Sequence, residues 1–244
     1  MSVNRAKAVN LEKPRRFWKE AGAGPVDGGF AVLLDGRNAR TPGGTPLVLP
    51  TEAVAALVAE EWAAAGEEIE FAAMPATRLA FTAIDRVPQA REGVAEEVAR
   101  YAGSDLLCYF AEEPEALVAR QAAAWEPLLA WAEAELGLPL NRASGILPCA
   151  QPEGTAERVK ALALALDDFA LTALASATGL FGSAVLAFAV QRGRLSAGEA
   201  HDLSRLDEAF QEERWGVDAE AAERTANRAA EAQTLGRWFD ALRG

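Results

Sequence analysis

The chain has 244 residues, half of them hydrophobic, so it can bury a core large enough for one large domain or two small ones. It carries 24 Lys and Arg against 36 Asp and Glu, which gives a formal net charge of −12. Phosphate backbones repel a surface of this kind, so nucleic acid is excluded as an expected partner. Six of the cations lie in residues 1–20, and we therefore expect an acidic body with a basic N-terminal arm.

The cysteines and the N-terminal residues indicate in which cellular compartment the protein is expected. Cys108 and Cys149 each lie among apolar neighbours, which predicts two buried free thiols in a reducing compartment. The apolar segment of a secretory signal does not follow the basic N-terminus, and Glu12 and Glu20 argue against a transit peptide. We expect a cytoplasmic bacterial protein, or a mitochondrial one in the case of a eukaryotic homologue.

The N-terminal quarter predicts a small antiparallel β unit. Residues 30–34 are apolar and partly β-branched, and Asp35-Gly36 after them is a strong hairpin signal because glycine accepts positive φ at low cost. A second turn follows at residues 42–45, and residues 46–50 predict a third short strand.

From Thr51 onward the apolar spacing becomes helical, with Thr51 itself at the N-cap position. Trp62 lies on the same face of this helix as Val58, so we interpret it as structural support that packs against the β unit. Residues 68–72 alternate and predict a return to β structure. We place a domain boundary after residue 73.

Residues 74–137 are predominantly helical. Two helical patterns meet at Pro88, and residues 104–110 predict an extended connection or a buried turn. The next helix has an apolar arc of about 120° on the helical wheel, with Trp125 at its centre as structural support. Pro127 is expected to bend this helix, and Gly137 is expected to end it.

The C-terminal third predicts more helices after an aperiodic stretch. Residues 141–154 are interpreted as a loop or linker, and helices are expected within 155–191, 196–215 and 218–242. Ser196 and Glu199 form a capping-box pattern. His201, the single histidine, follows it and is interpreted as a surface or helix-end residue.

One segment, residues 171–190, has no charge and is long enough to span a bilayer. Much of it is Ala, Gly, Ser and Thr, which insert weakly, so we favour a buried core helix without membrane insertion. A membrane-anchored assembly factor is the alternative. The fold class predicted for the whole chain is α+β, with a small antiparallel β-rich domain at residues 1–73 and a larger, mostly α-helical domain at residues 74–244.

Sequence motifs for catalysis are absent. The chain has no GxSxG, no GxGxxG and no phosphate-binding GxxxxGK[ST] pattern. A lone histidine far from both cysteines does not make a zinc site. We therefore predict no catalytic residues, no metal and no cofactor. The alternative left open is a small hydrolase or isomerase that uses a carboxylate pair in an interdomain cleft.

The stretch LSRLDEAFQEERWG, residues 203–216, predicts a helix with two faces. Leu203, Leu206 and Phe210 share an arc of about 60° that faces the core, with Phe210 as structural support. A second arc of similar width carries Ser204, Glu208, Gln211 and Trp215; Asp207 lies between the two arcs, and Glu212 flanks the second. Either the helix at 218–242 covers Trp215, or this mixed face is a contact for a partner protein.

The motifs together resemble the assembly chaperones of the F-type ATP synthase, and more narrowly those that hold the free α subunit of its catalytic sector. The resemblance runs from about residue 15 to past residue 216, in the order and spacing of RRFWKE, LDGR…TP, LVLPTEAVA…EEW, MPATRL…AIDRV, SDLLCY, W-E-P-L-L-x-W-A and LSRLDEAFQEERWG.

The resemblance implies a β-rich domain joined to a helical domain, with no enzymatic activity, metal or nucleotide. It implies that the partner is the unassembled α subunit, whose β-facing surface is shielded, and we expect a monomer. The segment tied to function in the family reads SRLEEEYQxxxWG. Position 208 keeps an acid, position 207 holds the shorter Asp, and Ala209 lacks a carboxylate, for which Glu212 and Glu213 can compensate. The expected partner-binding residues are Asp207, Glu208, Gln211, Glu212 and Trp215.

Overall fold

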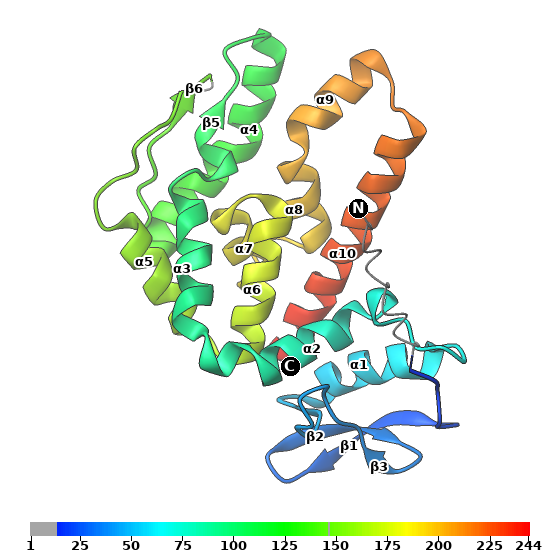
Figure 1. Cartoon of the computed structure of the whole chain (residues 1–244). Coiled ribbons are helices and arrows are strands. Elements are labelled where there is room, and N and C mark those ends of the chain that lie inside the picture. Colours follow the sequence, from blue (N-terminus) through cyan, green and yellow to red (C-terminus); the bar gives the residue numbers. More distant parts are fainter. Residues whose placement is uncertain (1–13, 146) are drawn as a thin grey trace, which may run out of the picture.

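A computed structural model describes residues 14–145 and 147–244 of the chain. A small antiparallel sheet carries the first helix on one face, and the remaining helices form a larger body beyond it (Figure 1). The α+β class predicted from the sequence is confirmed.

The sheet contains β1 (Ala21–Val26), β2 (Gly29–Leu34), β3 (Arg37–Asn38) and β4 (Val48–Leu49). β1 pairs antiparallel with β2, with Ala21 opposite Leu34, while β3 and β4 pair with different parts of β2. The predicted hairpin is present, and both of its turn residues have positive φ, 47° at Asp35 and 77° at Gly36. The sequence analysis missed β1, because AGAGPV contains one β-branched residue, Val26, among glycines, alanines and a proline that do not indicate a strand.

Helix α1 (Glu52–Ala64) packs on this sheet, with Thr51 accepting a hydrogen bond from the Val54 amide. Trp62 near its end is buried, and its ring centroid lies 5.0 Å from that of Trp18. The predicted strand at 68–72 is wrong: Glu68 makes a single bridge to Arg15, and Phe71–Ala73 form a 3-10 turn. Among the described residues, this alternating segment pairs with the rest of the chain only through that single bridge, so it does not form a strand.

The helical body surrounds α6, which contacts helices from both earlier and later parts of the chain. Its helices are α2 (Pro75–Asp85), α3 (Arg91–Ala102), α4 (Glu115–Trp131), α5 (Thr155–Leu164), α6 (Asp168–Phe181), α7 (Ala184–Gln191), α8 (Ala197–Ser204), α9 (Leu206–Trp215) and α10 (Ala219–Arg243). α4 continues into a π-helical turn, Ala132–Leu136, which Gly137 ends with φ 69°. The short strands β5 (Tyr109–Phe110) and β6 (Ala143–Ser144) pair in parallel beside α4.

The single core helix expected at residues 171–190 is instead two helices, most of α6 followed by α7. Gly182 adopts φ 66° and ends α6, and the Ser183 hydroxyl then accepts from the Leu186 amide and starts α7. Both pieces are largely buried, as predicted for a core position. Among the described residues, every helix falls short of the length or the apolarity that a bilayer crossing requires.

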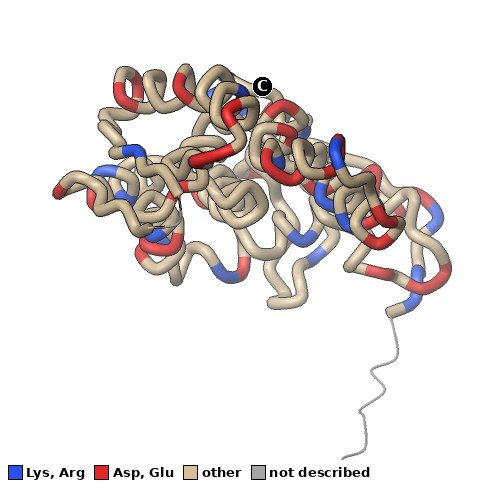
Figure 2. Tube along the Cα trace, turned by 90° about the horizontal axis from the view of Figure 1, so that it is seen from above, with Lys and Arg blue, Asp and Glu red and all other residues tan. Residues whose placement is uncertain are grey.

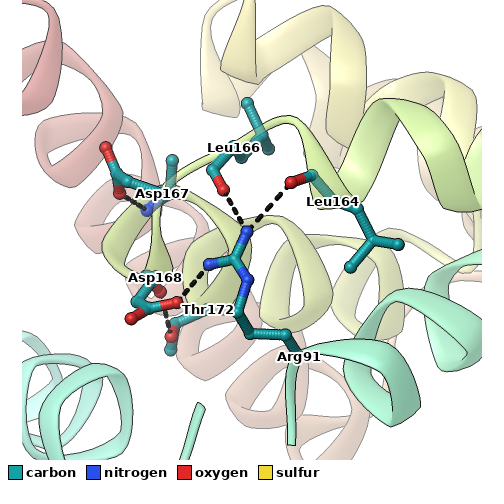
Figure 3. A network of polar contacts seen from close by, with 7 residues as sticks. Arg91, Leu164, Leu166, Asp167, Asp168 and Thr172 are labelled. Atoms are coloured by element: carbon teal, nitrogen blue, oxygen red, sulfur yellow. Dashed lines mark hydrogen bonds and ion pairs between the residues drawn. The ribbon is translucent and has the colours of Figure 1, made fainter. Parts of the chain in front are cut away.

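Arg91 on α3 fixes the turn between α5 and α6 (Figure 3). Its guanidinium donates to the carbonyls of Leu164 at 2.9 Å and Leu166 at 2.6 Å and pairs with the Asp168 carboxylate. The Asp167 side chain accepts from the Ala170 amide at 2.8 Å and caps α6. The two helices are therefore held at an angle by a side chain more than 70 positions earlier in the chain.

The helical stretch predicted at 196–215 is also divided, since α8 ends at Ser204 and α9 begins at Leu206. The predicted capping box between Ser196 and Glu199 is present. His201 is buried, with an exposed fraction of 5%, which corrects the surface interpretation. It lies at the C-terminal end of a short helix whose inner face meets α10, α7 and α6.

The two cysteines differ in exposure, contrary to the expectation that both are buried. Cys108 is buried, and burial raises the pKa of its thiol to about 12. Cys149 is only partly buried, in the long connection before α5. Acidic and basic residues are interspersed along the described part of the chain trace in the view of Figure 2.

Candidate functional site on helix α9

Helix α9 attaches to the body by one apolar edge. Leu206 and Phe210, four residues apart, are both buried, as the helical wheel predicts. The Arg214 guanidinium lies 4.3 Å from the centroid of the Phe210 ring and covers its outer side. Gly216, with φ 82°, ends the helix. α9 thus lies at the end of the molecule away from the sheet (Figure 1).

Two side chains of α4 brace α9. Gln121 is fully buried; its Oε1 accepts from the Ala111 amide at 2.7 Å, and its Nε2 donates to Asp207 Oδ1 at 2.7 Å. Arg120 Nη1 donates to both oxygens of the Glu213 carboxylate, at 2.8 and 2.9 Å. The helix is therefore fixed in rotation, and the side of α9 opposite α4 is directed to solvent.

Burial raises the pKa of the Asp207 carboxyl, and the neighbouring Glu208 charge raises it further. The hydrogen bond from Gln121 acts in the opposite direction because it favours the ionised form. Glu212 is also held within the molecule, since it pairs with Arg205 at 2.6 Å. These two acids of the predicted site are therefore engaged in internal contacts.

The other three predicted residues are exposed. Trp215 has an exposed fraction of 82%, so α10 does not cover it, and Val217 next to it has 52%. Glu208 and Gln211 are exposed too, and neither side chain has a hydrogen bond or ion pair with any described part of the chain. The structure thus presents a carboxylate, an amide and an indole on one helix, backed by two acids that internal contacts hold in place.

The sequence analysis missed the bracing residues Arg120 and Gln121. A signal for Gln121 was present, because this amide falls inside the apolar arc of α4, where a polar side chain must find a partner. No local signal points to Arg120, whose partner lies 93 positions away.

A groove of about 630 Å³ lies between α2, α6 and α10. Glu231 is the single carboxylate among its lining residues, so the groove does not hold the acid pair that the hydrolase alternative requires. Within residues 14–145 and 147–244, no three or more His, Cys, Asp or Glu side chains gather as a metal site would need.

Comparison with known proteins places these features in a family. The sequence pattern of the family described as ATP12 chaperone protein matches residues 15–133. The mitochondrial atp12 protein of Schizosaccharomyces pombe is 28% identical over 221 residues, which cover 86% of this chain and 76% of that protein.

Two solved structures are closely similar. The crystal structure of Atp12 from Paracoccus denitrificans is 47% identical, with a TM-score of 0.86, and the match covers 93% of this chain and 97% of that one. A protein of Agrobacterium tumefaciens is 40% identical, with a TM-score of 0.87, over 94% of this chain and 86% of that one. The chain therefore belongs to the ATP12 chaperone family, the assembly chaperones of the F-type ATP synthase that its sequence motifs resemble.

Proposed function

We propose that this chaperone binds the unassembled α subunit of the ATP synthase catalytic sector and prevents its aggregation before α and β subunits assemble. The outer face of α9 is the proposed contact, with Glu208, Gln211 and Trp215 touching the partner. Asp207 and Glu212 belong to the same site, and their internal contacts with Gln121 and Arg205 fix two further carboxylates beside this face. The protein acts without catalysis, as a monomer in the bacterial cytoplasm.

The observation that carries this proposal is the exposure of Trp215 beside an unpaired carboxylate. An indole that is 82% exposed has a large apolar area in water, which the folded chain alone gains nothing by displaying. Exposed Trp flanked by charge is typical of the residues that dominate protein–protein interfaces. A free subunit displays both apolar and charged interface, so a surface of both kinds suits it.

The test is to mix the purified chaperone with the isolated α subunit and to follow light scattering and the dissociation constant. The parent is expected to suppress aggregation. Glu208→Lys is expected to weaken binding at least about tenfold, because reversing a charge in an interface costs on the order of 1.4 kcal/mol or more. Trp215→Ala is expected to weaken it by a similar factor.

Glu97→Lys is the matched control, since Glu97 is also exposed on a helix, α3, and the substitution changes the charge equally. It is expected to bind α like the parent. All variants should retain the circular dichroism spectrum and thermal midpoint of the parent, because neither Glu208 nor Trp215 is buried. Unchanged binding by Glu208→Lys would show that the site assignment is wrong, and a parent that fails to protect α would refute the function itself.

A further inference from the structure

The groove between α2, α6 and α10 is bordered by complete helical stripes. α2 contributes Pro75, Arg78, Leu79 and Thr82, which follow the i, i+3, i+4, i+7 spacing of one helix face. α10 contributes the same spacing and one further residue, through Asn227, Ala230, Glu231, Thr234 and Leu235. α6 forms the floor with Thr172 and Ser176, one turn apart.

This spacing is the one that helices use to pack against another helix. At 1.5 Å per residue the stripes on α2 and α10 run for about 10–12 Å, which corresponds to two helical turns. Thr82, Ala230 and Thr234 along them are small, so a backbone can approach closely at these positions. Three helices thus surround a position that a fourth helix would fill.

The two walls of the groove carry opposite charges that have no internal partner. Arg78 on α2 and Glu231 on α10 are both exposed, and neither side chain pairs with any residue in the described parts of the chain. The α10 wall is held in place from outside the groove, because the Arg228 guanidinium donates to the Leu180 carbonyl at the end of α6. The groove is therefore polarised across its width, with its cation and anion free to meet groups of opposite sign.

We propose that this groove binds two turns of an amphipathic helix of the same α subunit that α9 contacts. The inference rests on the proposed function and adds a second contact to it. The bound helix presents small or apolar side chains to α6, an acid toward Arg78 and a base toward Glu231. Helix α10 connects the groove with the C-terminal end of α9. It begins at Ala219, just after α9 ends at Trp215, and reaches the groove at Asn227.

A crosslinking experiment identifies the occupant. A photoreactive p-benzoylphenylalanine replaces Ala230, a small groove residue, and the full-length variant is irradiated with the α subunit and digested for mass spectrometry. The expected product joins position 230 to one peptide of α that carries both an acid and a base within two turns of a helix. A product with residues 1–13 of the chaperone's own chain, or no product with α, would overturn the proposal.

Charge variants test the polarity of the groove. Arg78→Glu and Glu231→Lys are each expected to weaken α binding about tenfold, because like charges then face each other across a dry contact. The double variant Arg78→Glu/Glu231→Lys restores the net charge but inverts the polarity, so it is expected to bind most weakly. A double variant that binds like the parent would overturn the proposal, since net charge alone would then explain the single variants.

The controls distinguish a failure of the groove proposal from a failure of the proposed binding of the α subunit. Arg86→Glu, at the end of α2 and outside the groove lining, makes the same change as Arg78→Glu and is expected to leave binding unchanged. If Glu208→Lys weakens binding but all groove variants bind normally, the groove proposal fails alone. If the parent does not bind α, both proposals fail.

Discussion

Asp207 and Glu208 are adjacent acids, but only Asp207 has a partner within the described part of the chain, the side-chain amide of Gln121. The buried Gln121 gives its only acceptor to the Ala111 amide, so its Nε2 is free to donate to Asp207. Asp207 is half-buried beside this amide, and burial raises the pKa of its carboxyl although the hydrogen bond from Gln121 lowers it, whereas Glu208 projects into solvent without an internal partner among the described residues. A charge that must meet a partner is thus separated from one that fixes the helix.

Asp207→Asn is predicted to raise the thermal midpoint at pH 7. A carboxyl whose pKa is higher in the folded state than in the unfolded state makes ionisation unfavourable for folding. The cost is absent below the unfolded pKa, near 3.8, and is complete once the pH has risen past the raised value. Asn removes this cost and still offers an oxygen to Gln121.

The measurement is a series of thermal melts of parent and variant between pH 7 and pH 4. The difference in midpoint should shrink as the pH falls, because the parent becomes protonated too. A variant that is less stable than the parent at pH 7 would mean that the negative charge itself holds α9 to Gln121.

Helix α10 is one continuous helix, but its two halves differ in how they pack against the rest of the protein. No residue of the first half, positions 219–231, is buried, whereas Ala232, Leu235, Trp238 and Phe239 in the second half are. The first half is rich in Ala, Glu and Arg, which favour helix without tertiary contacts. This first half begins next to the C-terminal end of α9 and borders the groove at its other end.

Hydrogen exchange is predicted to separate the two halves. Amides at 219–231 should exchange at least about tenfold faster than those at 232–243, since local opening there exposes little buried surface. Adding the α subunit should slow exchange at 227–231, where the groove is, as well as in α9. Equal protection of both halves in the free protein would contradict this account of α10.

At the scale of the whole molecule, the second half of α10 connects the sheet unit to the helical body. Trp238 is fully buried and its Nε1 donates to the Phe169 carbonyl of α6 at 3.2 Å. On the other side, the Thr51 hydroxyl at the start of α1 donates to the Ala241 carbonyl at 2.7 Å. The last helix therefore contacts both regions, and the domain boundary after residue 73 stays a prediction.

Trp238→Ala is predicted to lower the free energy of unfolding by about 3–5 kcal/mol, the cost of a large cavity at a fully packed aromatic. Urea denaturation followed by circular dichroism and by tryptophan fluorescence measures it. Arg237→Ala is the neighbouring control; it removes only an exposed ion pair with Glu60, so a change below about 1 kcal/mol is expected. A loss below 1 kcal/mol for Trp238→Ala would show that this end of α10 is not an anchor.

The sequence by itself determined the features that depend on a few neighbouring residues. The hairpin at Asp35-Gly36, the capping box at Ser196, the helix end at Gly137 and the burial of Trp125 all follow from local geometry and spacing. The two faces of α9 were also predictable, because a helical wheel needs only the order of side chains.

Only the tertiary structure decided how the turns between helices are held and which faces remain uncovered. Arg91 holds the turn before α6 from a distant part of the chain, and the amide of Gln121 selects Asp207 for an internal contact. The exposure of Trp215 and the open groove beside α10 depend on where neighbouring helices stop. These outcomes depend on contacts between residues far apart in the chain, which local spacing does not encode.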